Sequence, residues 1–202
     1  MLKKSFYLIL FVTFIQSSIF CMAGGMSKDS LYFLIKRDDV QVLIDAAGKG
    51  DKDKVLKLIN KGVDVNSTDK YGYTALMTAC FYGNPEMVQL LIDSNAYINM
   101  KTCEGTTELL LAIQFLVSTR KPQMKIIIRQ LIDAGANINA KDVCGENPLM
   151  LASIAGEKDV VEFLIKKGAD VKATNNNGQS ALSLAKKLKH QEIIELLSKY
   201  QS

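Results

Sequence analysis

Apolar residues fall into two consecutive helical patterns within a short stretch of the chain. Leu76, Ala79 and Cys80 share one face of a first helix, where small side chains allow close packing against a neighbour. A second stripe follows after a polar break, and its apolar positions are Met87, Val88, Leu91 and Ile92. The pattern predicts two short helices joined by a tight turn.

Capping residues mark the ends of both predicted helices. Gly72 gives the backbone freedom that a turn needs, and Thr74 offers a side-chain oxygen as the first N-cap. Gly83 ends the first helix, and Asn84-Pro85 begins the second as an N-cap followed by proline at the first helical position. The two helices therefore form one compact helix–turn–helix unit.

This unit recurs along the chain. Five alanines stand in phase at steps of 33, 33, 40 and 33 residues: Ala46, Ala79, Ala112, Ala152 and Ala185. Four turn glycines keep the same phase: Gly72, Gly105, Gly145 and Gly178. So do the segments 62–66 (GVDVN), 95–99 (NAYIN), 135–139 (GANIN) and 168–172 (GADVK). Asn95 stands where the others have Gly, and Asn is well tolerated in a left-handed cap. Because one such unit cannot bury its own apolar face, the units must stack.

A 33-residue period with these segments resembles the ankyrin repeat, whose pattern runs D-x-x-G-x-T-P-L-x-x-A-A, then Gly, an apolar helix and G-A-D-V-N. The resemblance covers Val40 to about Lys199. It implies an all-α fold, an ankyrin-repeat solenoid of stacked helix–turn–helix units with β-turn or hairpin loops between them. The end units depart from the pattern, as terminal caps do.

The repeats divide the chain into seven segments. They are 1–23 (signal peptide), 24–39 (lead-in helix), 40–69 (first, capping unit), 70–102 (repeat), 103–142 (repeat with insertion), 143–175 (repeat) and 176–202 (C-terminal capping repeat).

The 40-residue step places seven additional residues inside the third unit. The apolar run Leu109–Val117 predicts a lengthened first helix before Ser118–Pro122 turns the chain. The insertion is either a protrusion that contacts a partner or a loop tolerated because long surface insertions cost little.

The first 23 residues have the layout of a secretory leader. Lys3 and Lys4 form a basic start, Phe6–Ile15 is apolar, and Cys21-Met22-Ala23 provides small residues at the −3 and −1 positions of a cut before Gly24. The apolar stretch is short of the ~20 residues that span a bilayer. The layout therefore predicts an exported, bacterial protein, located in the periplasm or secreted.

Cys21 leaves a second interpretation open. A bacterial lipoprotein signal carries the lipid on such a cysteine. The signal requires a small residue just before the cysteine, and Phe20 is bulky. We favour cleavage. The alternative is a membrane-tethered lipoprotein that acts as accessory or inhibitor of an envelope enzyme, and membrane contact is expected only if Cys21 is lipidated.

Composition argues against several classes of function. The 25 Lys and Arg against 21 Asp and Glu give +4, which falls to +2 when Lys3 and Lys4 leave with the leader, too little for a nucleic-acid partner. The only histidine, His190, lies in the last cap, so no Ser or Cys nucleophile has a credible His partner. We expect no catalytic residue, no metal site, no cofactor and no small-molecule substrate.

Three cysteines remain after cleavage: Cys80, Cys103 and Cys144. Cys80 replaces the second alanine of its unit, so we expect it to be buried. Neighbouring units stack roughly 10 Å apart, too far for a disulfide between the turn cysteines. All three are therefore predicted to be free thiols.

The resemblance also implies where a partner would bind. Ankyrin proteins usually bind their partners through the turn tips and the ends of the first helices, which line the concave side. Carried over position by position, these are Tyr71, Tyr73, Phe81 and Tyr82; Cys103, Glu104, Thr106, Gln114 and Phe115; Val143, Cys144, Glu146 and Ile154; and Asn176, Asn177 and Gln179.

Three of the chain's seven tyrosines fall within twelve residues of the second unit, from Tyr71 to Tyr82. Tyrosine gives large contact area at low entropy cost and is enriched at binding hot spots. The alternative is that these rings pack on each other or on Phe115 and only stiffen the stack. The working hypothesis is a non-catalytic, monomeric module that binds another protein. The basic cluster Lys186–His190 is either an acidic-partner or phosphate patch or, as we favour, the solvated face of the terminal cap.

Overall fold

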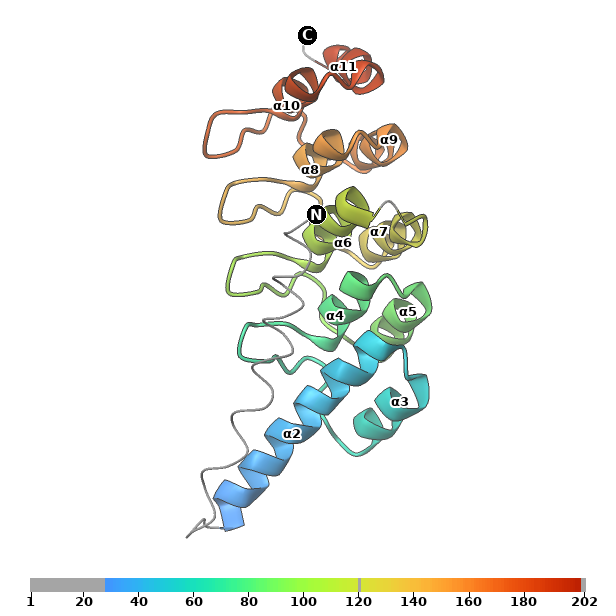
Figure 1. The fold of residues 1–202 in the computed structure, drawn as a ribbon, viewed down its shortest axis with the longest axis vertical. Coiled ribbons are helices and arrows are strands. Elements are labelled where there is room, and N and C mark those ends of the chain that lie inside the picture. Colours follow the sequence, from blue (N-terminus) through green and yellow to red (C-terminus); the bar gives the residue numbers. More distant parts are fainter. Residues whose placement is uncertain (1–27, 120, 201–202) are drawn as a thin grey trace. The chain divides into compact units, whose positions relative to one another are not determined.

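The structure of the chain, a computed structural model, describes residues 28–119 and 121–200, so the predicted leader lies outside the described part. The chain divides into two compact units, Met1–Arg37 and Asp38–Ser202, and the second holds the repeats. Every regular element in the described part is a helix (Figure 1): α2 (Lys28–Lys49), α3 (Lys52–Asn60), α4 (Ala75–Tyr82), α5 (Pro85–Asp93), α6 (Glu108–Thr119), α7 (Gln123–Asp133), α8 (Pro148–Ala155), α9 (Lys158–Lys166), α10 (Ala181–Leu188) and α11 (Gln191–Ser198).

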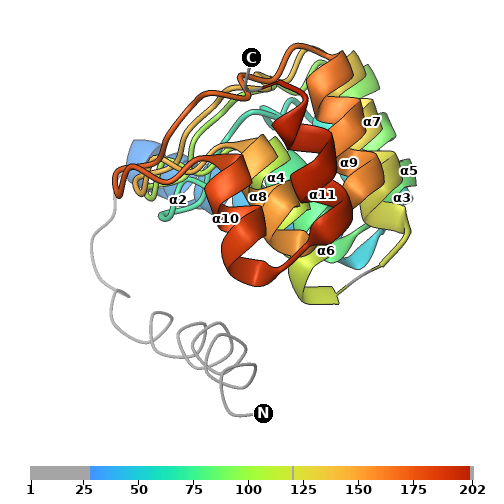
Figure 2. The ribbon, with the colours of Figure 1, turned by 90° about the horizontal axis from the view of Figure 1, so that it is seen from above.

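Within residues 38–202 the helices form two layers. The inner layer holds α4, α6, α8 and α10, and each contacts the next along the stack. The outer layer holds α3, α5, α7, α9 and α11, while the hairpin loops project from one side (Figure 2). This all-α solenoid confirms the predicted fold. The predicted lead-in helix and the first helix of the first unit run together as α2, whose last turns take the inner position.

The predicted caps are present in the second unit. Thr74 Oγ1 accepts a hydrogen bond from Met77 N at 3.1 Å, and Asn84 Oδ1 accepts one from Met87 N at 2.9 Å. Gly83 ends α4 in the left-handed conformation, with φ of 73°. Asn95 also takes the left-handed conformation that the sequence predicted, with φ of 63°.

Small residues of the inner helices let the units approach closely. The five in-phase alanines are buried, each with 2% or less of its surface exposed: Ala46, Ala79, Ala112, Ala152 and Ala185. Leucines of the outer helices are buried at another repeated position: Leu58, Leu91, Leu131, Leu164 and Leu197. These residues belong to one apolar core that runs through all five units. Full burial of one such large side chain stabilises the fold by about 1.5–3 kcal/mol.

The hairpin loops are shaped by one polar side chain each. Asp69 Oδ1 accepts hydrogen bonds from Tyr71 N at 2.8 Å and Tyr73 N at 2.9 Å. The same paired bonds recur at Thr102, Asp142 and Asn175. Gly72 lies so close to the next hairpin that a Cβ there would come within 3.1 Å of the Thr102 Cα. The hairpins are therefore braced from within and packed against one another.

Asparagines join successive units through the loops that follow the outer helices. Asn66 Oδ1 accepts from Tyr97 N at 2.6 Å, and Asn99 Oδ1 accepts from Asn137 N at 2.6 Å. Asn139 Oδ1 accepts from Asp170 N at 2.8 Å, while its amide nitrogen donates to Gly168 O at 3.3 Å. Each of these Asn residues is the last residue of a repeated segment. This common position in the repeat places each side chain against the next unit.

The insertion lengthens both helices of the third unit. The first helix, α6, has 12 residues against 8 in α4, which confirms the predicted lengthening. The second helix, α7, has 11 residues against 9 in α5, and this was not predicted. Of its two additional residues, Gln123 and Met124, the apolar Met124 is buried. The insertion is thus mostly helix, with only a short turn between.

One carboxylic acid is buried in the stack. Glu108 begins α6 with only 1% of its surface exposed, and its Oε2 accepts from Asn99 N at 3.0 Å. Its Oε1 has no hydrogen-bond partner. Burial raises the pKa of Glu108 from 4.5 to about 7, more than its bonds to backbone N–H groups lower it.

Cys80, Cys103 and Cys144 are free thiols. Cys80 is buried, as predicted, and burial raises the pKa of its thiol well above the ordinary range, with the Glu108 carboxylate adding to the effect. A buried thiol with a raised pKa carries little thiolate and is unreactive. Cys103 and Cys144 are exposed on neighbouring hairpins.

We predict that Asn139→Ala lowers the free energy of unfolding by about 1–2 kcal/mol, because the change leaves an N–H and a carbonyl of the next unit without their partners. Urea denaturation followed by circular dichroism measures this. Asn177→Ala, on an exposed hairpin tip, is the matched control and should stay within about 0.5 kcal/mol of the parent. Equal losses in both variants would contradict the role of the inter-unit bonds.

We also predict that stability falls as pH rises from about 5 to 7.5. The folded-state pKa of Glu108 lies above its unfolded value, so the folded state binds more protons over this range, and the loss on deprotonation is about 3 kcal/mol. Glu108→Gln should remove most of this slope in denaturation series at several pH values. Glu104→Gln, exposed on the same hairpin, should keep the slope of the parent; an unchanged slope in Glu108→Gln would refute the assignment.

Candidate functional site

The hairpin tips form the first part of the predicted binding surface. Tyr71 and Val143 are large apolar side chains that stand exposed on the tips, with 48% and 66% of their surfaces accessible. The Lys70 ammonium lies 4.9 Å from the centre of the Tyr71 ring. Cys103 N donates to Tyr71 O at 3.0 Å, which ties neighbouring tips together. The tips thus offer apolar contacts on a backbone that is already ordered.

The ends of the inner helices form the second part. The Phe81 and Phe115 rings lie with centroids 3.9 Å apart, and Phe81 meets Tyr82 edge to face at 5.1 Å. Tyr82 covers Gly48, where a Cβ would come within 3.0 Å of its ring, yet 48% of Tyr82 stays exposed. We call the following residues the helix-end surface: Gly48, Lys49, Phe81, Tyr82, Gln114, Phe115, Ile154, Lys187 and Leu188. Its aromatic part spans two successive units, the second and the third.

The structure separates the tyrosines that the sequence placed in one cluster. Tyr71 precedes α4 and Tyr82 ends it, so the length of that helix, about 12 Å for eight residues, lies between them. Tyr71 belongs to the hairpin tips and Tyr82 to the helix-end surface. Tyr73 is half-buried at the base of the hairpin. Residues close in sequence therefore contribute to two separate contact zones.

The remaining predicted positions differ in accessibility. Glu104 and Asn177 are exposed, whereas Gln114, Ile154, Glu146 and Gln179 are half-buried. Gln179 Oε1 accepts from Asn175 Nδ2 at 3.3 Å, so this side chain also braces its own hairpin. Thr106 corrects the prediction: only 6% of it is exposed, because it closes the base of its hairpin, where its carbonyl accepts from Thr102 N. It offers no surface to a partner.

Partial burial raises the pKa of one carboxylic acid on the hairpin side of the molecule. Glu146 lies at the base of the third hairpin, and burial raises its pKa, with the nearby Asp142 carboxylate adding to the effect. Exposed Lys141 lies on the same hairpin, where its Nζ donates to Thr174 O at 2.8 Å, and exposed Lys101 lies on the hairpin before it. The hairpin side is therefore mixed in charge.

Some charges of the outer helices are paired between units. Lys125 Nζ lies 2.7 Å from Glu157 Oε2 and 2.9 Å from Asp159 Oδ2, and these hydrogen bonds, that to Glu157 foremost, raise the pKa of Lys125. Lys167 pairs with Asp133 at 2.8 Å in the same way. Such exposed pairs contribute little to stability, but they partner these charges within the fold. The ion pairs of the outer face therefore link neighbouring units of the stack.

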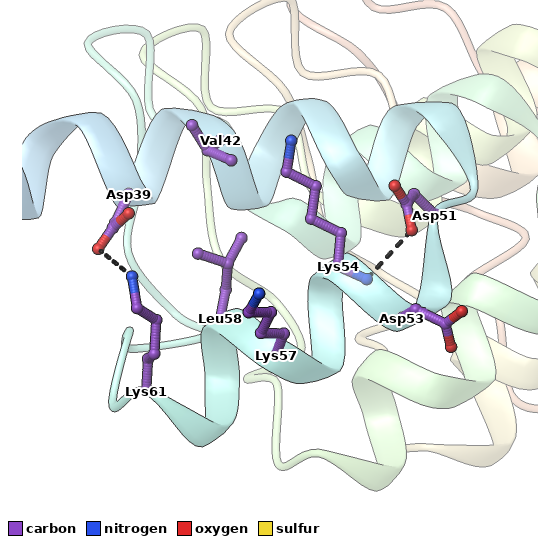
Figure 3. Close-up of a pocket in the computed structure, with 8 residues that line it drawn as sticks. All are labelled: Asp39, Val42, Asp51, Asp53, Lys54, Lys57, Leu58 and Lys61. Atoms are coloured by element: carbon purple, nitrogen blue, oxygen red, sulfur yellow. Dashed lines mark hydrogen bonds and ion pairs between the residues drawn. The ribbon is translucent and has the colours of Figure 1, made fainter.

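A shallow groove lies between α2 and α3 at the start of the repeats (Figure 3). Val42 and Leu58 project into it from the two helices. Three of its charged side chains have partners within the fold: Lys61 pairs with Asp39 at 3.7 Å, and Asp51 caps α3 by accepting from Lys54 N at 3.1 Å. The groove has no convergent set of polar groups that would hold a small ligand.

Among the described residues, no group of three or more His, Cys, Asp or Glu side chains is placed to hold a metal ion. Over the same residues, no helix is both long and apolar enough to cross a bilayer.

Two features of the helix-end surface were missed by the sequence analysis. Gly48 stands where later units have Phe81 or Ile154, and its small size leaves room for the Tyr82 ring. Leu188 is 45% exposed beside the basic cluster and extends the apolar row to the last unit. Aligning all five first helices by their alanines gives the signal for both, because it brings positions 48, 81, 114, 154 and 187 into one row and positions 49, 82, 115, 155 and 188 into the next.

Comparison with known proteins agrees with this geometry. The sequence matches the family described as "Ankyrin repeats (3 copies)" over residues 43–121 and 121–202. The relatives include the "Ankyrin repeat, SAM and basic leucine zipper domain-containing protein 1" of Ornithorhynchus anatinus, 30% identical over 66% of this chain and 27% of that protein. Alpha-latrotoxin-Lg1a of Latrodectus geometricus is 30% identical over 61% of this chain and 9% of its own length.

A third relative is "Protein fem-1 homolog A-like" of Mus musculus, 28% identical over 50% of this chain and 14% of that protein. The matched part of this chain thus spans about a quarter or less of the length of these three relatives, which share the repeats with it. Ankyrin repeats generally mediate protein–protein interactions and are typically non-catalytic. With the family matching most of its length and the repeats stacked as that pattern requires, this chain belongs to the ankyrin repeat family.

Proposed function

We propose that this protein is a non-catalytic module that binds another protein on the face lined by its hairpin tips and inner-helix ends. The observation that carries the proposal is the continuous aromatic row of Tyr82, Phe81 and Phe115, which remains partly exposed across two neighbouring units. A stack that needed these rings only for its own packing would bury them. Here the core lies beneath them and is complete without their outer faces.

The hairpin tips add a second contact zone. Tyr71 and Val143 expose apolar surface, and their loops are ordered by the Asp69 and Asp142 side chains before any partner arrives. Binding to a surface that is already ordered loses less conformational entropy than binding that must first fold a loop. Two separated zones on one rigid face favour a partner that lies across several units.

Tyr71, Tyr73 and Tyr82 provide the test. Replacing all three by serine should abolish capture of a native partner and lower the melting temperature only slightly, since Tyr71 and Tyr82 are about half exposed. Single variants should weaken capture separately, because the two zones lie at opposite ends of α4. The measurements are affinity capture followed by quantitative mass spectrometry, and thermal denaturation.

Gln89→Ser is the matched control on the outer face and should leave capture unchanged; its side chain donates to Asp93 on its own helix. A triple variant that fails to fold would instead favour rings that only support the stack. A folded triple variant that still captures the same partner would refute the proposed surface.

We further propose that the module is exported, as a bacterial protein, after cleavage behind Ala23. The support is the sequence of residues 1–23, with its basic start, short apolar stretch and small residues before Gly24. We expect that expression of the full chain in a bacterial host gives a periplasmic protein whose first residue is Gly24, as read by mass spectrometry. Palmitate incorporated at Cys21 would instead favour the tethered lipoprotein. A retained Met1 would contradict export by this route.

A further inference from the structure

The helix-end surface combines its aromatic row with an unusual distribution of charge. Exposed lysines lie on it or directly beside it, at the ends of the inner helices or in the turns that follow: Lys49, Lys121, Lys186, Lys187 and Lys189. None of them has an ion-pair partner among the described residues. On the outer face, by contrast, Lys125, Lys158 and Lys167 each pair with an acid of a neighbouring unit.

The few acids near this surface are already engaged in the fold. Asp51 follows the first inner helix and caps α3 by accepting from Lys54 N. Glu157 follows α8, and its carboxylate lies 2.7 Å from Lys125 Nζ. Asp45 accepts from Gln41 Nε2 at 3.0 Å. The charge that this surface offers to a partner is therefore positive, next to exposed apolar side chains.

Lys189 adds an independent observation. It ends α10 in the left-handed conformation, with φ of 60°, at the position where Gly83 and Gly156 end α4 and α8. A side chain other than glycine costs about 1 kcal/mol in that conformation. Glycine would give the more stable cap at this position, and local backbone strain of this kind clusters at functional positions.

The surroundings of Lys189 leave its charge free to act outward. His190 Nε2 lies 3.2 Å from Ile154 O, which fixes the chain just after Lys189 against the fourth unit. Lys186 and Lys187 occupy the last turn of α10, and Leu188 is exposed between them and Lys189. Three lysines and one leucine thus stand together at the end of the row that begins with Tyr82.

We propose that the helix-end surface binds an extended protein segment that carries apolar or aromatic residues at one end and acidic residues at the other. This inference rests on the proposed function and names the class of its partner. The apolar end lies on Phe81, Tyr82 and Phe115, and the acidic end lies on Lys186, Lys187 and Lys189. Helices pack 8–10 Å apart, so the two ends are separated by about 20 Å, or roughly six residues of extended chain.

Opposite charge speeds association and selects the partner, and its effect weakens with salt. A peptide library with random sequences of about 12 residues, selected on the full chain, tests the class directly. Enriched peptides should hold Leu, Phe or Trp together with two or more Asp or Glu, spaced by roughly six residues. Their affinity, measured by fluorescence anisotropy, should fall as NaCl is raised from 50 to 300 mM.

The variant Lys186→Glu/Lys187→Glu should weaken these peptides by about tenfold or more. Lys166→Glu is the matched control, because Lys166 is also an exposed lysine in the last turn of a helix, but on the outer layer. With one charge reversed instead of two, it carries about half the cost to the helix dipole, and it should change affinity less than about twofold. Equal affinities in the two variants would overturn the proposal.

Lys189→Gly separates binding from capping. It relieves the left-handed strain, so the melting temperature should rise, while affinity for the selected peptides should fall by about threefold through loss of one charge. A lysine that serves only as a cap would give higher stability with unchanged affinity, which would overturn the proposal.

The outcomes also separate this inference from the proposed function. Enriched peptides that require Tyr71 or Tyr82 but lack acidic residues, and that bind Lys186→Glu/Lys187→Glu normally, would leave the proposed function standing and overturn the acidic partner. A library that yields no peptide overturns the segment proposal. In that case, lysine-dependent binding to phosphatidylglycerol vesicles, absent with phosphatidylcholine alone, would assign the surface to a membrane instead.

Discussion

Stacking is a requirement of this chain, because each pair of helices carries apolar side chains on faces that the pair cannot cover by itself. The inner helices meet through a row of alanines, among them Ala79 and Ala112, whose small size lets the backbones come close. Leucines of the outer layer close the core behind them. The hairpins, the inter-unit hydrogen bonds and the exposed rings all depend on this spacing between units.

Hydrogen bonds between the units fix how each unit is aligned on the next, which the burial of apolar side chains alone would not specify. Asn66, Asn99 and Asn139 each reach from one unit to the backbone of the next. The hairpins are ordered by their own acid, amide or hydroxyl side chains, so their tips are in place before a partner arrives. The insertion leaves this frame unchanged: it adds four residues to α6 and two to α7, and it keeps Ala112 and Leu131 in their repeated positions.

The third unit also shows where the repeat departs from its own pattern. Glu108 occupies a position held by Ala75, Pro148 or Ala181 in other units, and its carboxyl is buried with one oxygen unpaired. The sequence shows the substitution, but not its cost, because burial depends on the loop at Asn99 folding over the start of α6. The same applies to Thr106: its place in the pattern predicts a surface position, while the packed hairpin base encloses it.

The sequence by itself determined the number of units, their caps, the location of the insertion and the burial of Cys80, because each follows from a local pattern repeated at a fixed period. Only the tertiary structure decided which surface residues meet. Tyr71 and Tyr82 lie close in sequence but at opposite ends of α4, whereas Phe81 and Phe115, 34 positions apart, stack at 3.9 Å. Periodicity encodes the position of a residue within its unit; contacts between side chains of neighbouring units depend on how the units are stacked and on which rotamers the stack leaves room for.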